Sequence, residues 1–314
     1  LDSRYWEQGE LECGPLGFSV FRREGKWEKW VPELLREADL PGAKIGVSGA
    51  DMSVADYLKF QDAAKGLPWA MRPQWGPAGR IIEKLRRQKD AREMSLLQKA
   101  VDIADQAFER AVATFEAGMT ERQLAARIRD LVRELGAEDV SFDTIVAAGP
   151  RGAMPHAAPT EAVIEAGQPV VVDMGANYEG YCSDLTRTFV PGTPPPRFAA
   201  VYEAVFEAQR NAIEKVEPGM TSAAAHELAH EVIRRAGYGD CFGHGLGHGV
   251  GLDVHEDPYL GPAGEDVLQE GMVFTIEPGI YLERFGVRTE INMVWTAQGP
   301  EVTGPRQHEI VRVV

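Results

Sequence analysis

An internal duplication constrains the fold of this chain more than any other feature. The segment FEAGMTERQLAARIRDLVRELGA aligns with VEPGMTSAAAHELAHEVIRRAGY, so that Gly118 falls on Gly219 and Gly136 on Gly237 at the same offset of 101 residues. Each copy begins with Gly-Met-Thr, whose threonine suits a helix N-cap, and ends in a glycine that suits a left-handed C-cap. The repeat predicts two equivalent halves related by an internal pseudo-twofold axis.

Each half also carries a pair of acids after its helix. Asp173 and Asp184 lie in VVVDMGANYEGYCSDLTRTF, Glu277 and Glu290 lie in VFTIEPGIYLERFGVRTEINMVW, and His248 lies in HGLGHGVGLDVHE. A turn-rich stretch separates the acids of each pair, so two paired strands would bring them side by side. Clustered carboxylates repel one another and are costly to desolvate, and a fold usually gathers them around cations. The pattern predicts a two-metal hydrolase centre near the pseudo-twofold axis.

Composition narrows the class of protein. The formal net charge of −15 argues against nucleic acid or an anionic membrane as a partner. We find no apolar run of membrane-spanning length and no signal peptide. The cysteines Cys13, Cys182 and Cys241 are scattered, without CxxC spacing, and are expected to be free thiols. These features favour a soluble enzyme of the reducing cytoplasm.

The pattern changes divide the chain into two domains. Residues 1–82 mix strand-like runs, such as GFSVFRR and AKIGVSG, with helical stretches and indicate a small α/β domain. Residues 83–314 hold the duplicated catalytic domain. A stiff connection rich in proline and tryptophan precedes it. The basic run KLRRQK at its start is interpreted as a solvated helix face rather than a partner surface.

Several ordered motifs reveal a family. The stretches PHAAPT, VVVDMGANYEGYCSDLTRTF, GHGLGHGVGLDVHE, TIEPGIY and GVRTE resemble the pita-bread metallopeptidases, and within them the Xaa-Pro branch of aminopeptidase P and prolidase. The resemblance covers nearly all of residues 90–314, with a weaker echo in DSRYWEQ. It implies an α+β fold with a pita-bread catalytic domain and a creatinase-type N-terminal domain, here expected to be incomplete. A homodimer is expected.

The resemblance also assigns metal ligands. It implies that Asp173 chelates one cation, that His248 and Glu277 hold the other, and that Asp184 and Glu290 bridge the two. One nitrogen among five side chains makes an oxygen-rich site, which suits Mn²⁺ or Mg²⁺ better than the thiolate-rich sites of structural zinc. Two divalent ions per subunit are expected, with Mn²⁺ first and Zn²⁺ or Co²⁺ as alternatives.

The same resemblance gives the histidines roles in catalysis. His255 is expected to steady the oxyanion, His156 to lie near the scissile amide, and His244 to line the proline side of the cleft. Glu277 counts as catalytic as well as metal-binding. A hydrogen-bonded structural histidine is the alternative for each of the three. His308 carries no signal and is interpreted as structural or exposed.

Two positions agree with relatives and two depart from them. Tyr281 and Arg288 are present and expected to approach substrate, against the alternatives of strand packing and a surface ion pair. Many members have Asn at Arg151, which here would either clamp a substrate carboxylate or lie at the loop surface. Many have Asp at Ile291, whose absence would loosen metal affinity.

A second metal motif is interpreted as a decoy. His226 to His230 spell HExxH, a zinc-peptidase signature on a helix. The expected apolar stripe of that helix turns both histidines toward solvent, and the duplicate helix has Ala125 and Arg129 in their places. The expected stripe consists of Ala225, Leu228, Ala229, Val232 and Ala236.

Three functions remain open at this point. The leading hypothesis is a peptidase that cleaves the Xaa-Pro bond in dipeptides or at the N-terminus of longer peptides. The alternatives are a methionine aminopeptidase and a metal-free relative, either a creatinase-type hydrolase or a binding module. All five metal ligands are present, which favours the metal-dependent enzymes. The sequence does not separate a dipeptidase from an aminopeptidase.

Overall fold

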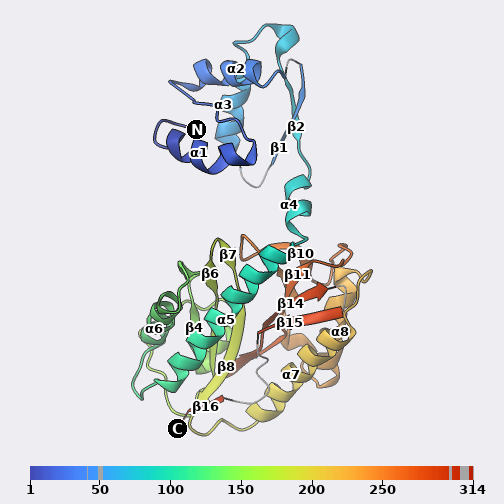
Figure 1. The fold of residues 1–314 in the computed structure, drawn as a ribbon. Coiled ribbons are helices and arrows are strands. Elements are labelled where there is room, and N and C mark those ends of the chain that lie inside the picture. The colour runs from blue at the N-terminus through green and yellow to red at the C-terminus, as the bar shows by residue number, and fades with distance from the viewer. Residues whose placement is uncertain (41, 49–51, 297–298, 305–310, 314) are drawn as a thin grey trace. The chain divides into compact units, whose positions relative to one another are not determined.

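A computed structural model describes residues 1–40, 42–48, 52–296, 299–304 and 311–313 (Figure 1). The chain forms two compact units, Leu1–Ile82 and Glu83–Val314. His308 lies outside the described residues. Among the residues that are described, no helix is both long and apolar enough to cross a membrane.

The first unit is small and mixes helices with one short sheet. Strands β1 and β2 pair in parallel, and helices α2 and α3 pack around a core that contains Trp30 and Val31. Residues 17–23, expected to be strand-like, are not assigned as a strand, although Leu1 exchanges backbone hydrogen bonds with Phe21 and Arg23. The assignment of this unit as an incomplete creatinase-type domain stays a prediction. Its elements are α1 (Trp6–Cys13), η1 (Gly14–Leu16), α2 (Trp27–Glu37), β1 (Lys44–Val47), α3 (Val54–Ala64), η2 (Trp69–Met71) and β2 (Gln74–Pro77).

The interpretation of the basic run KLRRQK as a solvated helix face was wrong for the second half of the run, although Lys84 is exposed on a helix. Helix α4 (Ile81–Arg86) ends inside the run. Beyond it, the side chains of Arg87 and Lys89 are only 11% and 2% exposed, and each forms an ion pair with acids between residues 253 and 266. Acids more than 160 residues away in sequence bury this end of the run.

The duplication predicted from the sequence is confirmed by the helices of the second unit. Helix α6 (Glu121–Glu134) corresponds to α8 (Ser222–Arg235), residue for residue at the predicted offset. The N-caps are Thr120 and Thr221, whose side chains accept backbone N–H groups at the third helical residue. Glycines in the left-handed region follow both helices. The long helices α5 (Ala91–Ala113) and α7 (Phe198–Lys215) complete the two helix pairs.

Each half contributes one sheet built around an antiparallel strand pair. Strand β5 pairs with β8, and β11 pairs with β14, as the spacing of the acids predicts. A smaller hairpin is inserted into each of these pairs, β6–β7 in the first and β12–β13 in the second. The sheet orders are β16-β8-β5-β4 and β10-β9-β11-β14-β15.

The strands of the first half are β3 (Asp139–Val140), β4 (Ile145–Ala148), β5 (Val170–Met174), β6 (Ala176–Tyr178), β7 (Tyr181–Cys182) and β8 (Leu185–Pro191), with η3 at Gly149–Ala153. Those of the second half are β9 (Gly247–Gly249), β10 (Glu256–Leu260), β11 (Val273–Ile276), β12 (Gly279–Leu282), β13 (Phe285–Arg288), β14 (Ile291–Thr296) and β15 (Gly299–Thr303), with η4 at Gly239–Cys241. Strand β16 (Val311–Val313) pairs in parallel with β8.

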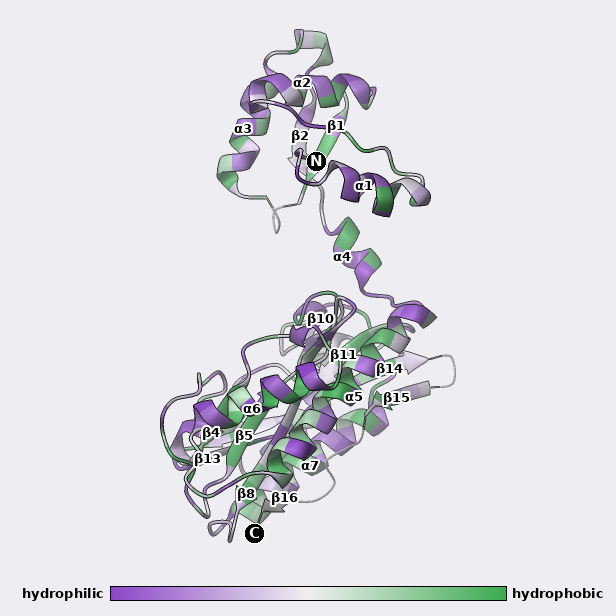
Figure 2. Cartoon of the chain, turned by 60° about the vertical axis from the view of Figure 1, so that its left-hand side comes forward, coloured by the Kyte–Doolittle hydropathy of each residue, from purple (hydrophilic) through white to green (hydrophobic). Residues whose placement is uncertain are grey.

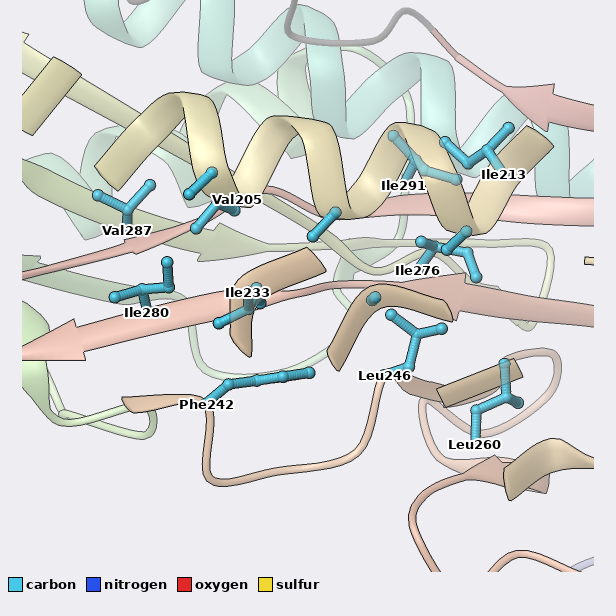
Figure 3. Close-up of a cluster of buried hydrophobic side chains, with 14 of the residues drawn as sticks. Val205, Ile213, Ile233, Phe242, Leu246, Leu260, Ile276, Ile280, Val287 and Ile291 are labelled. Carbon is cyan, nitrogen blue, oxygen red and sulfur yellow. The ribbon is translucent and has the colours of Figure 1, made fainter. Parts of the chain in front are cut away.

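Each half also has its own hydrophobic core between helices and sheet. The core of the first half centres on α5, α6 and Phe189, and the core of the second on α7, α8 and Phe274. Figure 2 shows hydrophobic and hydrophilic residues side by side on α5 and α7, as expected of helices with one buried face. In the second core, Phe242 and Leu246 contribute side chains from the segment that leads into β9 (Figure 3). The two cores fix the strands that carry the acids.

Candidate metal centre

The predicted metal ligands converge from both halves of the second unit. Asp173 lies on β5, Asp184 directly before β8, His248 on β9, Glu277 directly after β11 and Glu290 directly before β14. Within each of three groups, one possible ligand atom per residue lies within 4.8 Å of the others. The groups are Asp184, His248 and His255; His248, Glu277 and Glu290; and Asp173, Asp184 and Glu290.

These acids are buried close together, so their negatively charged form is costly unless positive charge balances it. Burial raises the pKa values of Asp184 and Glu290 well above the ordinary range, and neighbouring carboxylates raise them further. Burial also raises the pKa of Glu277, while His248 opposes the shift. Asp173 Oδ1, Asp184 Oδ1 and Glu290 Oε1 are buried, and none has a hydrogen-bond partner among the described residues. Such unsatisfied hard oxygens, beside one imidazole nitrogen, fit divalent cations.

The ring of His248 is oriented so that one nitrogen can bind a cation. Its Nδ1 lies 3.0 Å from the carbonyl oxygen of Gly249, which assigns the proton to Nδ1 and leaves the Nε2 lone pair free. Nε2 then faces Glu277 Oε1 at 3.4 Å and Asp184 Oδ2 at 3.5 Å. The glycine-rich run around it is needed for close approach, because a Cβ on Gly247 would lie 2.0 Å from the carbonyl oxygen of Thr275.

Two threonines orient the ligands, and the sequence reading missed both. Thr275 Oγ1 donates to Glu277 Oε1 at 3.1 Å and accepts the backbone N–H of His248. Thr186 Oγ1 donates to Glu290 Oε2 at 2.6 Å. The sequence could have indicated both threonines. Each lies two residues from a ligand in its own hairpin, and residues two apart point to the same face of a strand.

The predicted substrate residues form one hydrogen-bonded chain that reaches the metal ligands. Arg288 is buried and donates to Thr186 Oγ1 at 2.9 Å and to the Tyr281 hydroxyl at 3.0 Å. The Tyr281 hydroxyl lies 2.8 Å from His244 Nε2. Burial, followed by the charge of Arg288, lowers the pKa of His244 to about 4, so this ring is neutral near pH 7. Its Nδ1 donates to the carbonyl oxygen of Gly245, and its Nε2 therefore accepts a hydrogen bond from the Tyr281 hydroxyl. Arg288 therefore belongs to a buried network rather than a surface ion pair.

The predicted catalytic histidines lie in loops. His255 is exposed, and its ring centroid lies 4.2 Å from that of His248. Partial burial and the neighbouring His248 lower the pKa of His255. His156 is exposed and follows Pro155, whose carbonyl oxygen accepts from Arg288 at 3.2 Å. The structure thus brings His255 directly to the cluster and ties the loop of His156 to the Arg288 network.

Arg151 forms an ion pair with a buried carboxylate, and a role in clamping a substrate carboxylate stays a prediction. Its Nε donates to Glu121 Oε2 at 2.9 Å, and the Glu121 side chain is fully buried at the start of α6. The same carboxylate accepts backbone N–H groups from Ala148 and Thr160. This ion pair closes the base of the loop that carries His156. Ile291 is buried in the core of the second half, and its effect on metal affinity stays a prediction.

The prediction that the HExxH histidines face solvent was wrong for His226. Its side chain is buried, and its ring stacks with those of His230 and Phe242 at centroid distances of 5.6 Å and 5.5 Å. The buried face of α8 runs through Ile233 rather than the exposed Ala236, and Phe242 covers the adjoining side. Neither histidine belongs to the three ligand groups found within the described parts of the chain.

The fold and the acid cluster define a pita-bread hydrolase with a metal-ligand set, and comparison with known proteins gives the family. Residues 95–297 match Metallopeptidase family M24. The chain belongs to this family of peptidases.

Proteins similar to this chain carry the names Xaa-Pro dipeptidase and X-Pro aminopeptidase. The Xaa-Pro dipeptidase of Pyrococcus furiosus is 44% identical over 232 residues, which cover 74% of this chain and 67% of that protein. The solved structure of an Xaa-Pro dipeptidase from Bacillus anthracis is 35% identical, with a TM-score of 0.91 over 99% of this chain and 85% of that one. An X-Pro aminopeptidase from Thermotoga maritima is also 35% identical, with a TM-score of 0.87 over 99% and 86%.

Proposed function

We propose that this protein is a dinuclear metallopeptidase that hydrolyses the Xaa-Pro bond, in dipeptides or at the N-terminus of longer peptides. One observation carries the metal part of the proposal. Three buried carboxylate oxygens of one cluster have no hydrogen-bond partner within the described parts of the chain, and burial and mutual repulsion raise the pKa values of Asp184 and Glu290. The names of the relatives support the substrate.

The ligand assignment is the one that the family resemblance implies, and the closeness of these side chains in the three groups supports it. Asp173 would hold one cation, His248 and Glu277 the other, and Asp184 and Glu290 both. Bound cations would supply Lewis acidity and lower the pKa of water, so that a nucleophile exists at neutral pH. Mn²⁺ is the proposed metal because the donor set is rich in carboxylates, with Zn²⁺ or Co²⁺ as substitutes.

The protein's own groups would handle the protons. Hydrolysis adds water to the scissile carbonyl and requires a proton on the departing proline nitrogen. Glu277, which lies beside His248 in the acid cluster, would take the proton of water and pass it to that nitrogen. His255 would donate a hydrogen bond to the carbonyl oxygen as negative charge develops there. His156 would contact the scissile amide from its own loop.

The Arg288 network would form the proline side of the site. His244 is neutral and hydrogen-bonded through Tyr281 to Arg288, so all three groups are held in place before substrate arrives. A pre-organised wall binds a rigid proline ring at a smaller entropic cost than a mobile one. A cytoplasmic homodimer is the proposed state of the protein.

A reconstitution assay tests the proposal. Chelator-treated protein is reloaded with Mn²⁺, Co²⁺ or Zn²⁺ and assayed on Xaa-Pro dipeptides, on longer Xaa-Pro peptides and on Met-Ala peptides. We expect metal-dependent cleavage of Xaa-Pro bonds, with about two ions bound per chain at full activity. Preference for Met-Ala would support a methionine aminopeptidase, and metal-independent turnover would support a creatinase-type enzyme.

A further inference from the structure

The segment between β9 and β10 that carries His255 closes on a buried carboxylate. Glu256 follows His255 directly, and its side chain is only 6% exposed. Its Oε1 accepts the backbone N–H of Asp253 at 3.0 Å, and the backbone N–H of Gly251 donates to the Asp253 carbonyl, also at 3.0 Å. These bonds fold residues 251–256 into a compact loop, hereafter the His255 loop. The backbone position of His255 therefore depends on Glu256.

Two cations from the start of the catalytic unit hold this carboxylate. Lys89 Nζ donates to Glu256 Oε2 at 3.1 Å, and the Lys89 side chain is 2% exposed. Arg86 donates to Glu256 Oε1 and, at 2.6 Å, to Asp253 Oδ2. A Cβ on Gly251 would lie 2.9 Å from Lys89 Cε and 2.8 Å from Glu256 Oε2, so the pair packs tightly against the loop backbone.

The lysine is itself fixed to the second sheet. Its backbone N–H donates to the carbonyl of Gly271 at 2.9 Å, and the neighbouring Gln88 forms a bridge with Met272 just before β11. Glu277, a proposed ligand, directly follows that same strand. Lys89 thus connects the His255 loop to the strand that positions a ligand.

The ion pair between Lys89 and Glu256 is buried, so loss of either charge would disturb the residues around it. Removing one partner leaves the other charged and desolvated, and the carboxylate must then move toward water or take up a proton. Either change would release the His255 loop. Because transition-state hydrogen bonds require placement within a fraction of an ångström, a shifted loop would weaken the contact of His255 with the oxyanion.

We propose that Lys89 and Arg86 are positioning residues that hold His255 in place through Glu256. The proposal rests on the catalytic role given to His255 under Proposed function, and it assigns a function to a basic run that the sequence alone presents as a charged helix face. Neither cation touches substrate in this arrangement. Their effect should reach the chemistry only through His255.

The first test compares Lys89→Met with Lys84→Met. Lys84 lies in the same basic run and is exposed, which makes it a matched control. We expect Lys89→Met to lower kcat about tenfold with KM within about twofold and metal content unchanged, whereas Lys84→Met keeps wild-type values. Glu256→Gln, which keeps the shape of the side chain, should match Lys89→Met. Wild-type kcat in Lys89→Met and Glu256→Gln would overturn the proposal.

A double-mutant cycle then asks whether the effect passes through His255. Lys89→Met should cost no further activity in a His255→Ala background, because the group it positions is gone. An undiminished tenfold loss there would overturn the proposal. If Lys89→Met does not fold, Arg86→Gln replaces it in the cycle, since the Arg86 side chain is 30% exposed and tolerates change better.

Hydrogen exchange separates failure of this proposal from failure of the proposed function. Amides of the His255 loop should exchange faster in Lys89→Met than in Lys84→Met. If His255→Ala keeps full kcat, the catalytic role of His255 fails and the positioning role fails with it, even where exchange is faster. If His255→Ala is impaired but exchange in Lys89→Met is unchanged, the positioning role alone is overturned.

Discussion

Arg288 on β13 donates from Nη2 to Asp173 Oδ2 on β5 at 2.5 Å, a bond that joins the two halves across 115 residues of sequence. The arginine occupies one carboxylate oxygen and leaves Oδ1 buried without a hydrogen bond. Oδ1 is therefore the oxygen of Asp173 that is left without a partner among the described residues and is available to a cation. Asp184 Oδ1 and Glu290 Oε1 are also buried without a hydrogen-bond partner among the described residues, and Arg187 bonds to Glu290 only at its backbone carbonyl oxygen.

The bridging acids should therefore be indispensable. We predict that Asp184→Asn or Glu290→Gln abolishes activity and lowers bound metal, because each amide replaces a charge that would serve both cations. The fold should persist, which circular dichroism can verify. Glu283→Gln is a suitable control because Glu283 is exposed in the β12–β13 turn. Full activity and full metal content in either site variant would refute the ligand assignment.

His255→Ala tests the oxyanion contact. We expect kcat to fall about a hundredfold or more with a modest change in KM, because the hydrogen bond forms only as the carbonyl is attacked. Elemental analysis should show unchanged metal. His255 also lies within ligand distance of Asp184 and His248, so a loss of metal would identify it as a ligand instead.

The stability of the metal-free protein should depend on pH in an unusual direction. Folding raises the pKa values of Asp184, Glu277 and Glu290, so the folded state binds more protons than the unfolded state. The stability of metal-free protein should then fall as pH rises above the ordinary carboxyl values of 3.8 and 4.5 and through the raised ones.

Thermal unfolding checks this expectation. Divalent metal should raise the melting temperature more at pH 8 than at pH 5, because cations replace the protons that the acids otherwise need. An equal or smaller gain at pH 8 would show that the acids are not the groups that bind the metal.

His226 should matter for stability and not for metal. His226→Ala removes a buried ring stacked on Phe242, and we expect a loss of about 2 kcal/mol with unchanged metal content. His230→Ala should cost about 0.5 kcal/mol or less, because its side chain is 29% exposed. Chemical denaturation with metal analysis measures both effects. Loss of metal in His226→Ala would restore the HExxH motif as a metal site.

Arg151→Ala tests whether the ion pair with the buried Glu121 stabilises the loop that carries His156. Glu121 would lose its ion pair with Arg151 while it stays fully buried, and we expect about 2 to 3 kcal/mol of lost stability. Arg122→Ala is the control, because its ion pair with Glu161 is exposed on both sides and should be worth about 0.5 kcal/mol. Equal losses in the two variants would contradict a structural role for Arg151.

The duplication was readable from sequence because each copy uses local signals. Thr120 and Thr221 cap helices, glycines end them, and the strand pairs follow from the spacing of the acids. These features depend on residues within one hairpin or one helix, and they led directly to the five proposed ligands.

Residues that depend on distant partners were misread. The residues near Lys89 in sequence predict a solvated side chain, but Lys89 is buried in an ion pair with Glu256. His226 becomes buried because Phe242 covers it from the segment after α8. Arg151 finds Glu121 across 30 residues. No local periodicity contains these pairings, because they arise from tertiary packing.

The division of the ligands between the halves also has a consequence for biosynthesis. Asp173 and Asp184 leave the ribosome well before Arg288, which later neutralises one of them, and before His248, Glu277 and Glu290. The first half of a nascent chain therefore carries these acids without Arg288 and without the other proposed metal ligands. Until those residues are made, water solvates the acids best. The five proposed ligands are present together only when the second half has emerged. Under the proposed function, binding of both cations is therefore expected only after translation has supplied both halves.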